Sequence, residues 1–318
     1  MKMPKPLKVT NVTPIEEIQK IGGKTRLFIK RDDLNGLLTS GNKARKLEYL
    51  VADALSKKCD TIITCGPVQS NHCRTTAAFA QMFKLDCHLF LRRKDNEETT
   101  GNLLLDQLMG AKIQYITPAQ YERRMELMAA YARTLKGRRP YIIPEGGSNE
   151  VGSLGYIDGM KEMAGFIKKN NIEAIYCAVG SGGTYAGLLL GKKLLRLKID
   201  LNGIIICDTV KYFEDKVMEI CVKAVAKYSL KTRVKRSDLH LIGGFVGEGY
   251  GIPYTAELKI IKDMAKYGII LEPVYTGKAF YGMLKNLQRK KYKKVLFVHT
   301  GGIFSIFAYS RELMRVIN

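Results

Sequence analysis

The chain has 318 residues, 46% of them hydrophobic, and a formal net charge of +22. This length can bury a sizeable core and usually divides into two domains. The opening residues MKMPKPLKVT lack the apolar run of a signal peptide, and no stretch reaches the roughly 18 apolar residues of a spanning helix. We therefore expect an intracellular, cytoplasmic protein that neither enters nor crosses a membrane.

The positive charge collects in two segments, residues 223–236 and 289–294. A nucleic-acid-binding protein would interleave such clusters with aromatic residues or carry them in a known binding module. Here they lie on the polar faces and at the ends of predicted helices. This placement favours a solvated surface that attracts anionic substrates and cofactors, and we expect no specific nucleic-acid binding.

The cysteines and histidines do not suggest a metal site. The seven cysteines form no CxxC pair, and the four histidines are scattered without ligand spacing. Cys65, Cys177 and Cys207 each lie in an apolar, strand-like run. We interpret them as buried free thiols in a reducing compartment.

Short apolar runs alternate with helix-period segments along most of the chain. The predicted strands are Thr61–Cys65, Cys87–Leu91, Lys112–Ile116, Tyr141–Pro144, Ala174–Val179, Ile204–Cys207 and Val295–His299. Amphipathic stretches between them include Thr75–Phe83, Gln120–Thr134, Ile157–Lys169 and Ala256–Tyr267. This alternation predicts an α/β protein with parallel sheets covered by helices on both faces. No linker-like segment separates two halves, so two domains would have to be interleaved.

Four predicted strands end in glycine-rich or polar turns, at residues 65–72, 144–149, 178–184 and 299–302. In open α/β sheets, ligands bind at the carboxyl ends of strands, where helix N-termini present free amides. One such turn is often only chain geometry. Four in one chain predict a substantial site.

The turn Val179–Thr184 (VGSGGT) follows an apolar strand and opens a predicted helix. Its glycines allow amide donors close to an anion, and the helix dipole favours a phosphate there. The turn is neither a P-loop nor GxGxxG, so nucleotide binding fits poorly. A single compact phosphate fits better, with a tight strand–helix turn that binds no ligand as the alternative.

A second segment, SGNKARK, places Lys43 between small and polar residues where a helix is predicted to begin. Neighbouring cations would lower the pKa of Lys43 and favour the nucleophilic amine that Schiff-base chemistry requires. An ordinary surface lysine is the alternative for this segment taken alone.

Seven segments in order carry a family resemblance. They are RDDLNGLLTSGNKARKLEYL, CGPVQSNHCR, PEGGSNEVGSLGY, VGSGGTYAG, GYGIP, EPVYTGKAFYGM and HTGG. Together, from about Arg31 to Gly302, they resemble the D-cysteine desulfhydrase and 1-aminocyclopropane-1-carboxylate (ACC) deaminase family, which are fold type II, tryptophan-synthase-β-like enzymes dependent on pyridoxal 5'-phosphate (PLP). The resemblance implies two interleaved, open, twisted and mostly parallel sheets flanked by helices, and a homodimer. It implies a large PLP-binding domain of residues 1–45 plus 153–318, and a small domain of residues 46–152.

The resemblance also implies roles for single residues. Lys43 matches the Schiff-base lysine, and Lys46 matches a contact to the cofactor's phosphate. Ser70, Asn71 and His72 match the substrate-binding loop, with Asn71 also facing the phenolic oxygen of PLP. The phosphate cup matches Gly180, Ser181, Gly182, Gly183 and Thr184. Tyr250 and Tyr275 match tyrosines near the substrate and the cofactor ring, and Thr300 matches the hydroxyl facing the pyridine nitrogen. Outside the family context, Ser70 could simply cap a helix, and the tyrosines could be ordinary buried aromatics.

Two positions bear on the choice of activity. Where ACC deaminases have Glu-Gly-Lys-Ser, this chain has Thr276-Gly277-Lys278-Ala279, and where they have leucine before the late glycine pair it has Thr300. Both departures favour D-cysteine desulfhydrase, with Thr276 near the substrate. The predicted reaction is α,β-elimination that yields pyruvate, sulfide and ammonia, with Lys43 or Tyr275 abstracting the Cα proton. ACC deaminase and L-cysteate sulfo-lyase remain alternatives, as does a basic nucleic-acid-binding protein on a degenerate enzyme fold.

Overall fold

Two β-sheets form the framework of the computed structural model, which describes residues 3–18, 21, 23–93 and 98–317. The larger sheet has the order β1-β2-β10-β7-β8-β9, and the smaller has the order β5-β4-β3-β6. The larger sheet contains β1 (Ile15–Ile18), β2 (Arg26–Arg31), β7 (Ala174–Val179), β8 (Asp200–Ile205), β9 (His240–Ile242) and β10 (Lys294–His299). The smaller contains β3 (Thr61–Pro67), β4 (Asp86–Arg92), β5 (Lys112–Ile116) and β6 (Pro140–Ile142).

The strand pairing is almost entirely parallel. Among the strands that the structure describes, only β1 pairs antiparallel, with β2 at the edge of the larger sheet; the other pairs in both sheets are parallel. The larger sheet takes strands from both ends of the chain, and the smaller takes all of its strands from the middle. The predicted fold class, two interleaved and mostly parallel sheets, is therefore confirmed. The domain boundaries at residues 45/46 and 152/153 stay a prediction.

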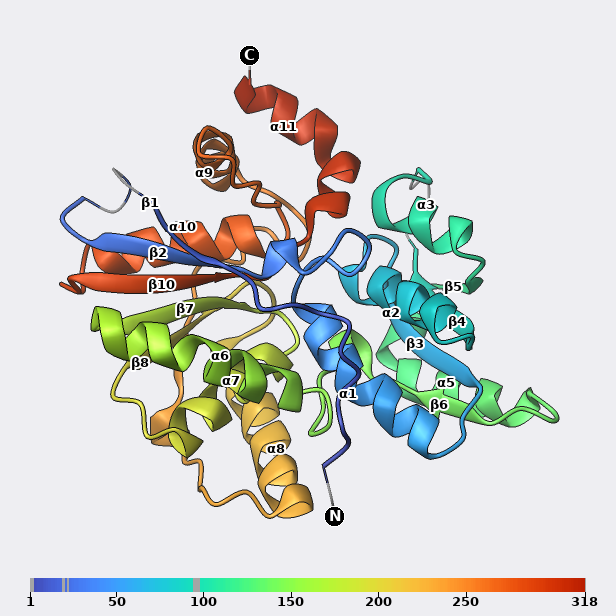
Figure 1. Cartoon of the computed structure of the whole chain (residues 1–318). Helices are drawn as coiled ribbons and strands as arrows, with labels where there is room; N and C mark the ends of the chain where they lie inside the picture. Colours follow the sequence, from blue (N-terminus) through green and yellow to red (C-terminus); the bar gives the residue numbers. More distant parts are fainter. Residues whose placement is uncertain (1–2, 19–20, 22, 94–97, 318) are drawn as a thin grey trace.

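Helices cover both sheets, and α1 lies between the two halves (Figure 1). They are α1 (Asn42–Ser56), α2 (Asn71–Met82), α3 (Gly101–Leu108), α4 (Pro118–Glu122), α5 (Arg124–Thr134), α6 (Leu154–Asn170), α7 (Gly183–Leu194), α8 (Val210–Tyr228), α9 (Thr255–Ala265), α10 (Thr276–Leu287) and α11 (Ser310–Ile317). Among the residues described, no helix is long and apolar enough to cross a bilayer.

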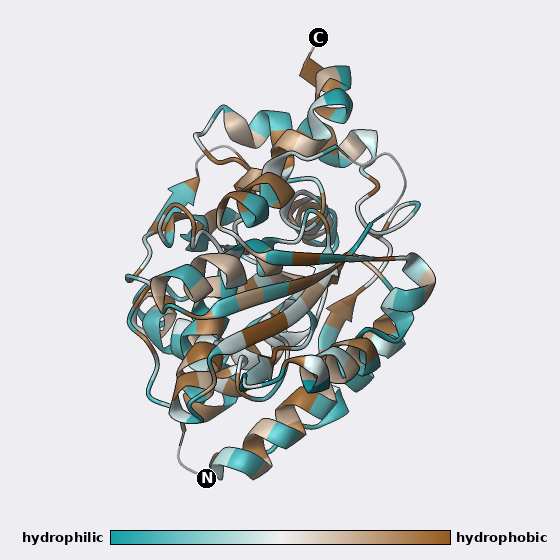
Figure 2. Ribbon diagram, turned by 90° about the vertical axis from the view of Figure 1, so that its right-hand side faces the viewer, coloured by the Kyte–Doolittle hydropathy of each residue, from teal (hydrophilic) through white to brown (hydrophobic). Residues whose placement is uncertain are grey.

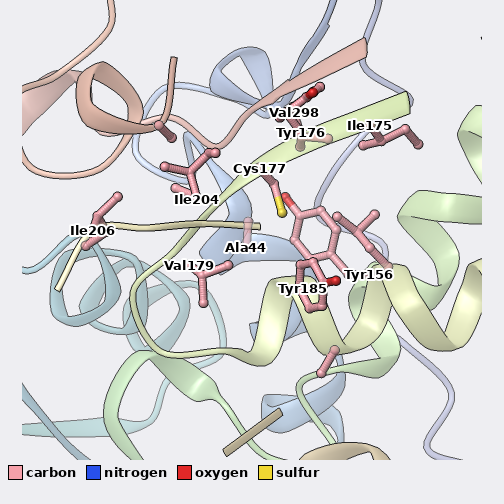
Figure 3. Close-up of a cluster of buried hydrophobic side chains, with 14 of the residues drawn as sticks. Ala44, Tyr156, Ile175, Tyr176, Cys177, Val179, Tyr185, Ile204, Ile206 and Val298 are labelled. Atoms are coloured by element: carbon pink, nitrogen blue, oxygen red, sulfur yellow. The ribbon is translucent and has the colours of Figure 1, made fainter. Parts of the chain in front are cut away.

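The core follows the apolar strands. Every residue of β7 is buried, and Figure 2 shows strands with apolar stretches flanked by helices in which hydrophilic and hydrophobic residues alternate. Beside β7, Tyr156 of α6 and Tyr185 of α7 lie near Cys177 in the cluster of Figure 3. All seven cysteines are free thiols, and all except Cys59 are buried.

Several predicted elements need correction. A strand was predicted at Ile204–Cys207, but it runs from Asp200 to Ile205. The prediction missed its start because the polar residues Asp200 and Asn202 interrupt the apolar pattern. The strand predicted at Tyr141–Pro144 ends at Ile142, since Pro144 has no amide to donate and a turn follows. The predicted helix Gln120–Thr134 is two helices that meet at Arg123. The strands β1 and β2 were not predicted, because their charged residues break the apolar pattern, and β9 was missed because it has only three residues.

A buried ion pair fixes the start of α1 against the larger sheet. Arg45 donates to Asp32 through Nε at 2.9 Å and through Nη2 at 2.8 Å. The Tyr156 hydroxyl donates to the same carboxylate at 2.6 Å, and Arg45 also pairs with Glu162 at 2.8 Å. Burial alone would raise the pKa of Asp32, but the charge and hydrogen bonds of Arg45 hold this pKa below its ordinary value. Asp32 is thus ionised, and its negative charge compensates the positive charge of the buried Arg45.

We expect Asp32→Asn to lower the free energy of unfolding by about 3–5 kcal/mol, because it leaves the buried Arg45 without half of its charge compensation. Urea denaturation measures the change. Glu17→Gln is the control, because Glu17 forms a surface pair with Arg26 and should leave the midpoint unchanged within error. Equal midpoints for Asp32→Asn and the native protein would show that the pair adds nothing.

Candidate active site

Two connected cavities lie where strands of both sheets end and α1 begins. The inner cavity measures about 30 Å³ and the outer cleft about 500 Å³, and both are lined by Lys43, Gly180, Ser181 and Tyr275. Asn71 and Thr300 also line the inner cavity, and Ser70, His72 and Tyr250 line the outer cleft. The four turns singled out in the sequence therefore converge on one site.

Lys43 lies in the first turn of α1 and is buried. Loss of hydration lowers the pKa of its amine to about 8, and the negative charge of Glu145 partly opposes this shift. The sequence predicted the lowered pKa but attributed it to neighbouring cations, whereas burial is the main cause. Lys43 therefore has a much larger fraction of neutral, nucleophilic amine near physiological pH than an exposed lysine has.

Lys46 lies one turn further along α1 and is 1% exposed. Its Nζ donates to the Gly146 carbonyl at 3.1 Å and to Ser148 Oγ at 3.0 Å, and no carboxylate of the described chain pairs with it. Burial, followed by repulsion from Lys43, holds the pKa of Lys46 well below its ordinary value. A buried lysine with only neutral partners can regain its charge when an anion binds beside it.

The start of α7 offers the place for such an anion. Gly182 has a φ of +83°, in the left-handed region that favours glycine, and α7 begins at Gly183. The Gly183 amide donates to Ser148 Oγ at 3.2 Å, the same hydroxyl that Lys46 contacts. A Cβ on Gly183 would lie 2.6 Å from Ser148 Oγ and 2.9 Å from Ser148 Cα, so only glycine lets this backbone lie so close to Ser148, with Lys46 Nζ beside it. Free amides, a helix dipole and a buried amine together fit a phosphate.

The polar turn before α2 has a mixed role. Ser70 caps this helix, because its Oγ accepts the Cys73 amide at 3.2 Å, yet it also lines the outer cleft. Asn71 Oδ1 accepts Asn102 Nδ2 at 2.9 Å, which leaves the Asn71 amide nitrogen available to the inner cavity. His72 lies 2.8 Å from the Thr64 hydroxyl, and burial lowers its pKa well below the ordinary value, so the ring stays neutral.

Tyr250 and Tyr275 lie next to one another in the wall of the cleft. Their hydroxyl oxygens are 2.5 Å apart and their rings are edge-on, with centroids 5.9 Å apart. Both side chains are only partly covered, but loss of hydration at the hydroxyls raises both pKa values well above the ordinary value. Tyr275 is therefore a neutral phenol, which disfavours it as a base and favours Lys43.

Thr276 and Thr300 lie in different surroundings. Thr300 lines the inner cavity. Thr276 is fully buried and lines neither cavity; its Oγ1 accepts the Glu272 amide at 2.8 Å, and its own amide donates to Glu272 Oε1 at 2.8 Å. Thr276 was predicted to contact the substrate, but its side chain points to Glu272 at the start of α10 and does not reach either cavity.

Two residues that support the site, Ser148 in the cleft wall and Lys278 behind it, carried no clear signal in the sequence. Ser148 joins Lys46, Ser181 and Gly183 through hydrogen bonds. Lys278 is fully buried, and its Nζ donates to the carbonyls of Val246 at 2.6 Å and Gly249 at 2.9 Å, in the loop that carries Tyr250. The TGKA motif could have drawn attention to Lys278, but nothing local pointed to the distant carbonyls.

No group of three metal-ligating side chains occurs among the described residues. The polar groups of the site instead suit an organic phosphate. Lys43 supplies an amine for the aldehyde of PLP, and Lys46 with the start of α7 fits the phosphate. Asn71, Tyr275 and Thr300 surround the space between.

A fold and site of this kind define an enzyme that carries an organic phosphate cofactor beside a buried amine. Residues 7–301 match the family described as "Pyridoxal-phosphate dependent enzyme". The chain belongs to this family, and its cofactor is pyridoxal 5'-phosphate.

Relatives divide between two named activities. A Thermotoga maritima protein provisionally named 1-aminocyclopropane-1-carboxylate deaminase is 43% identical over 95% of this chain and 97% of its own. An Arabidopsis thaliana bifunctional D-cysteine desulfhydrase/1-aminocyclopropane-1-carboxylate deaminase is 37% identical over 89% of this chain and 74% of its own. A crystal structure of an ACC deaminase homologue superposes with a TM-score of 0.92 at 38% identity, covering 99% of this chain and 97% of that one.

We expect Glu145→Gln to lower the pKa of Lys43 below about 8, because the Glu145 charge stabilises the ammonium form. NMR titration of the reductively ¹³C-methylated protein, freed of PLP, measures this pKa; the resonance missing from Lys43→Met identifies the residue. Glu122→Gln, which removes another carboxylate lining the cleft, is the matched control and should leave the pKa unchanged. Equal pKa values in both variants would contradict the role of Glu145.

Proposed function

We propose that this enzyme is a PLP-dependent lyase that converts D-cysteine and water to pyruvate, hydrogen sulfide and ammonia by α,β-elimination. The observation that carries this proposal is the buried Lys43 amine, with a pKa of about 8, beside the anion-binding start of α7. Thr300, in place of the leucine of ACC deaminases, supports the choice of elimination over ring opening.

The residues of the site divide the work. Lys43 would hold the cofactor through its amine, with Lys46, Gly180–Thr184 and Ser148 around the phosphate. PLP, when bound, withdraws electrons from the substrate and so acidifies its Cα proton. Lys43 is the group that would take this proton, since Tyr275 is held as a neutral phenol.

The remaining residues would bind and orient the substrate. The start of α2, with Ser70 and Asn71, presents backbone amides and a side-chain amide suited to the substrate's α-carboxylate. The hydroxyl pair of Tyr250 and Tyr275 closes the opposite wall and can donate a proton towards a leaving sulfur. His72 stays neutral beneath this turn and contributes shape rather than charge.

ACC cleavage is the second candidate, favoured by the names of the relatives and of the superposed structure. We further propose a cytoplasmic homodimer without specific nucleic-acid binding. Exposed apolar side chains at Leu37 and Phe307, 80% and 61% exposed, support a surface that a second copy covers. Nucleic-acid binding would not explain why Lys43 and Lys46 are buried beside the glycine turn that begins α7.

Replacing Lys43 with Ala should abolish turnover and the yellow colour of bound cofactor while leaving the fold intact, because Lys43 is the only amine of the described chain that lines both cavities. Mass spectrometry after borohydride reduction measures covalent attachment. The circular dichroism spectrum is the control for folding. Covalently retained PLP in this variant would assign the attachment to another lysine.

The native enzyme should release sulfide and pyruvate from D-cysteine and form little 2-oxobutyrate from ACC. Parallel assays of both products over a D/L panel test this expectation. Efficient use of ACC with no sulfide from D-cysteine would overturn the substrate and leave the PLP assignment standing. Colourless protein that cannot be reconstituted with PLP would instead favour the non-enzymatic alternative.

A further inference from the structure

One cation in the cleft has no place in the chemistry described so far. Arg92 is the last residue of β4, and its Cα pairs in register with that of Pro67 on β3. Pro67 leads directly into the turn of Ser70 and Asn71. Arg92 therefore lies at the carboxyl edge of the smaller sheet, next to the turn proposed for the α-carboxylate, and it lines the outer cleft.

The Arg92 guanidinium is held by aromatic rings. It lies 5.0 Å from the ring centroid of Tyr121 and 5.7 Å from that of Tyr250. The Tyr250 hydroxyl contacts Tyr275, which lines the inner cavity with Lys43. A stacked guanidinium keeps the N–H donors on its edge available for a planar anion.

A neighbouring cation of the cleft wall, Arg124, has a carboxylate partner. Arg124 lies over the other side of the same wall, 4.7 Å from the Tyr121 ring, and pairs with Glu145 at 3.1 Å. Glu122 and Asp208 also line the cleft. Within the described part of the chain, no carboxylate lies within 4.0 Å of the Arg92 guanidinium. Arg92 is thus a cation at the cleft wall with no carboxylate partner among the residues that the structure describes.

We propose that Arg92 binds a negatively charged group on the Cβ side of the substrate, which makes the enzyme select amino acids with a thiolate, sulfonate or carboxylate there. This inference rests on the proposed function, since it assigns the α-carboxylate to the start of α2. The position fits, because Arg92 lies beside Pro67, which leads into the turn of Ser70 and Asn71, and beside Tyr250 in the same cleft. In the elimination of D-cysteine, the same charge would favour the sulfur as it leaves as hydrosulfide.

The test compares aspartate with asparagine, which have nearly the same shape but differ in side-chain charge. Binding of each, as D and L forms, to the PLP-loaded enzyme is measured by calorimetry and by the change in cofactor absorbance. We expect the native enzyme to bind aspartate roughly ten- to a hundredfold more tightly than asparagine, as one charged hydrogen-bonded contact would give. Arg92→Met should abolish this preference, and Arg92→Lys should keep part of it.

Arg93→Met is the matched control. Arg93 is the next residue in sequence, is similarly half-buried, and stacks on Tyr115 at 4.6 Å without lining the cleft. This variant should keep the native preference for aspartate. Arg92→Lys, which keeps a positive charge, guards against a folding defect in Arg92→Met.

Three results would overturn the proposal. They are native enzyme that does not prefer aspartate, Arg92→Met that weakens aspartate and asparagine equally, and Arg93→Met that acts like Arg92→Met. A failure of the proposed function looks different. In that case D-cysteine releases no sulfide, yet the aspartate preference and its dependence on Arg92 persist.

Discussion

The attachment of α1 to the larger sheet determines where the reactive groups lie. Arg45 sits between Lys43 and Lys46 in sequence, and its buried pair with Asp32 fixes the helix at that point. Lys43 and Lys46 are three residues apart, so they share one face of α1, and Arg45 points away from both. The ion pair thus turns the lysine face towards the start of α7, and the cavities form between the two helices.

This arrangement places two amines where water cannot hydrate their charges. Burial lowers the pKa of Lys43 to about 8 and holds the pKa of Lys46 well below its usual range. An anion bound beside Lys46 would favour its ammonium form and so offset the cost of burying that charge. A ligand that binds only the folded state also stabilises the folded state. Cofactor binding and folding are therefore linked through the same buried lysine.

Local patterns were enough to predict part of this design. The apolar run Ala174–Val179 and the glycine turn after it predicted β7 and the phosphate cup, because both depend on neighbouring residues. The direction in which Thr276 points could not be predicted, since it depends on how Glu272 caps α10. Nor could the contacts of Lys278, whose partners lie about 30 residues away. Sequence reasoning placed the backbone turns better than the side chains they carry.

Lys278 shows how such a distant contact serves the site. The loop that carries Tyr250 has left-handed glycines at 247 and 251, so its backbone has little intrinsic preference for one conformation. The buried ammonium of Lys278 binds two carbonyls of this loop, and Tyr275 binds its tyrosine hydroxyl. Lys278 and Tyr275 are three residues apart at the start of α10, so one rigid helix end holds the loop at both places. The wall facing Lys43 is thereby as firmly placed as Lys43 itself, which a proton transfer at a defined distance requires.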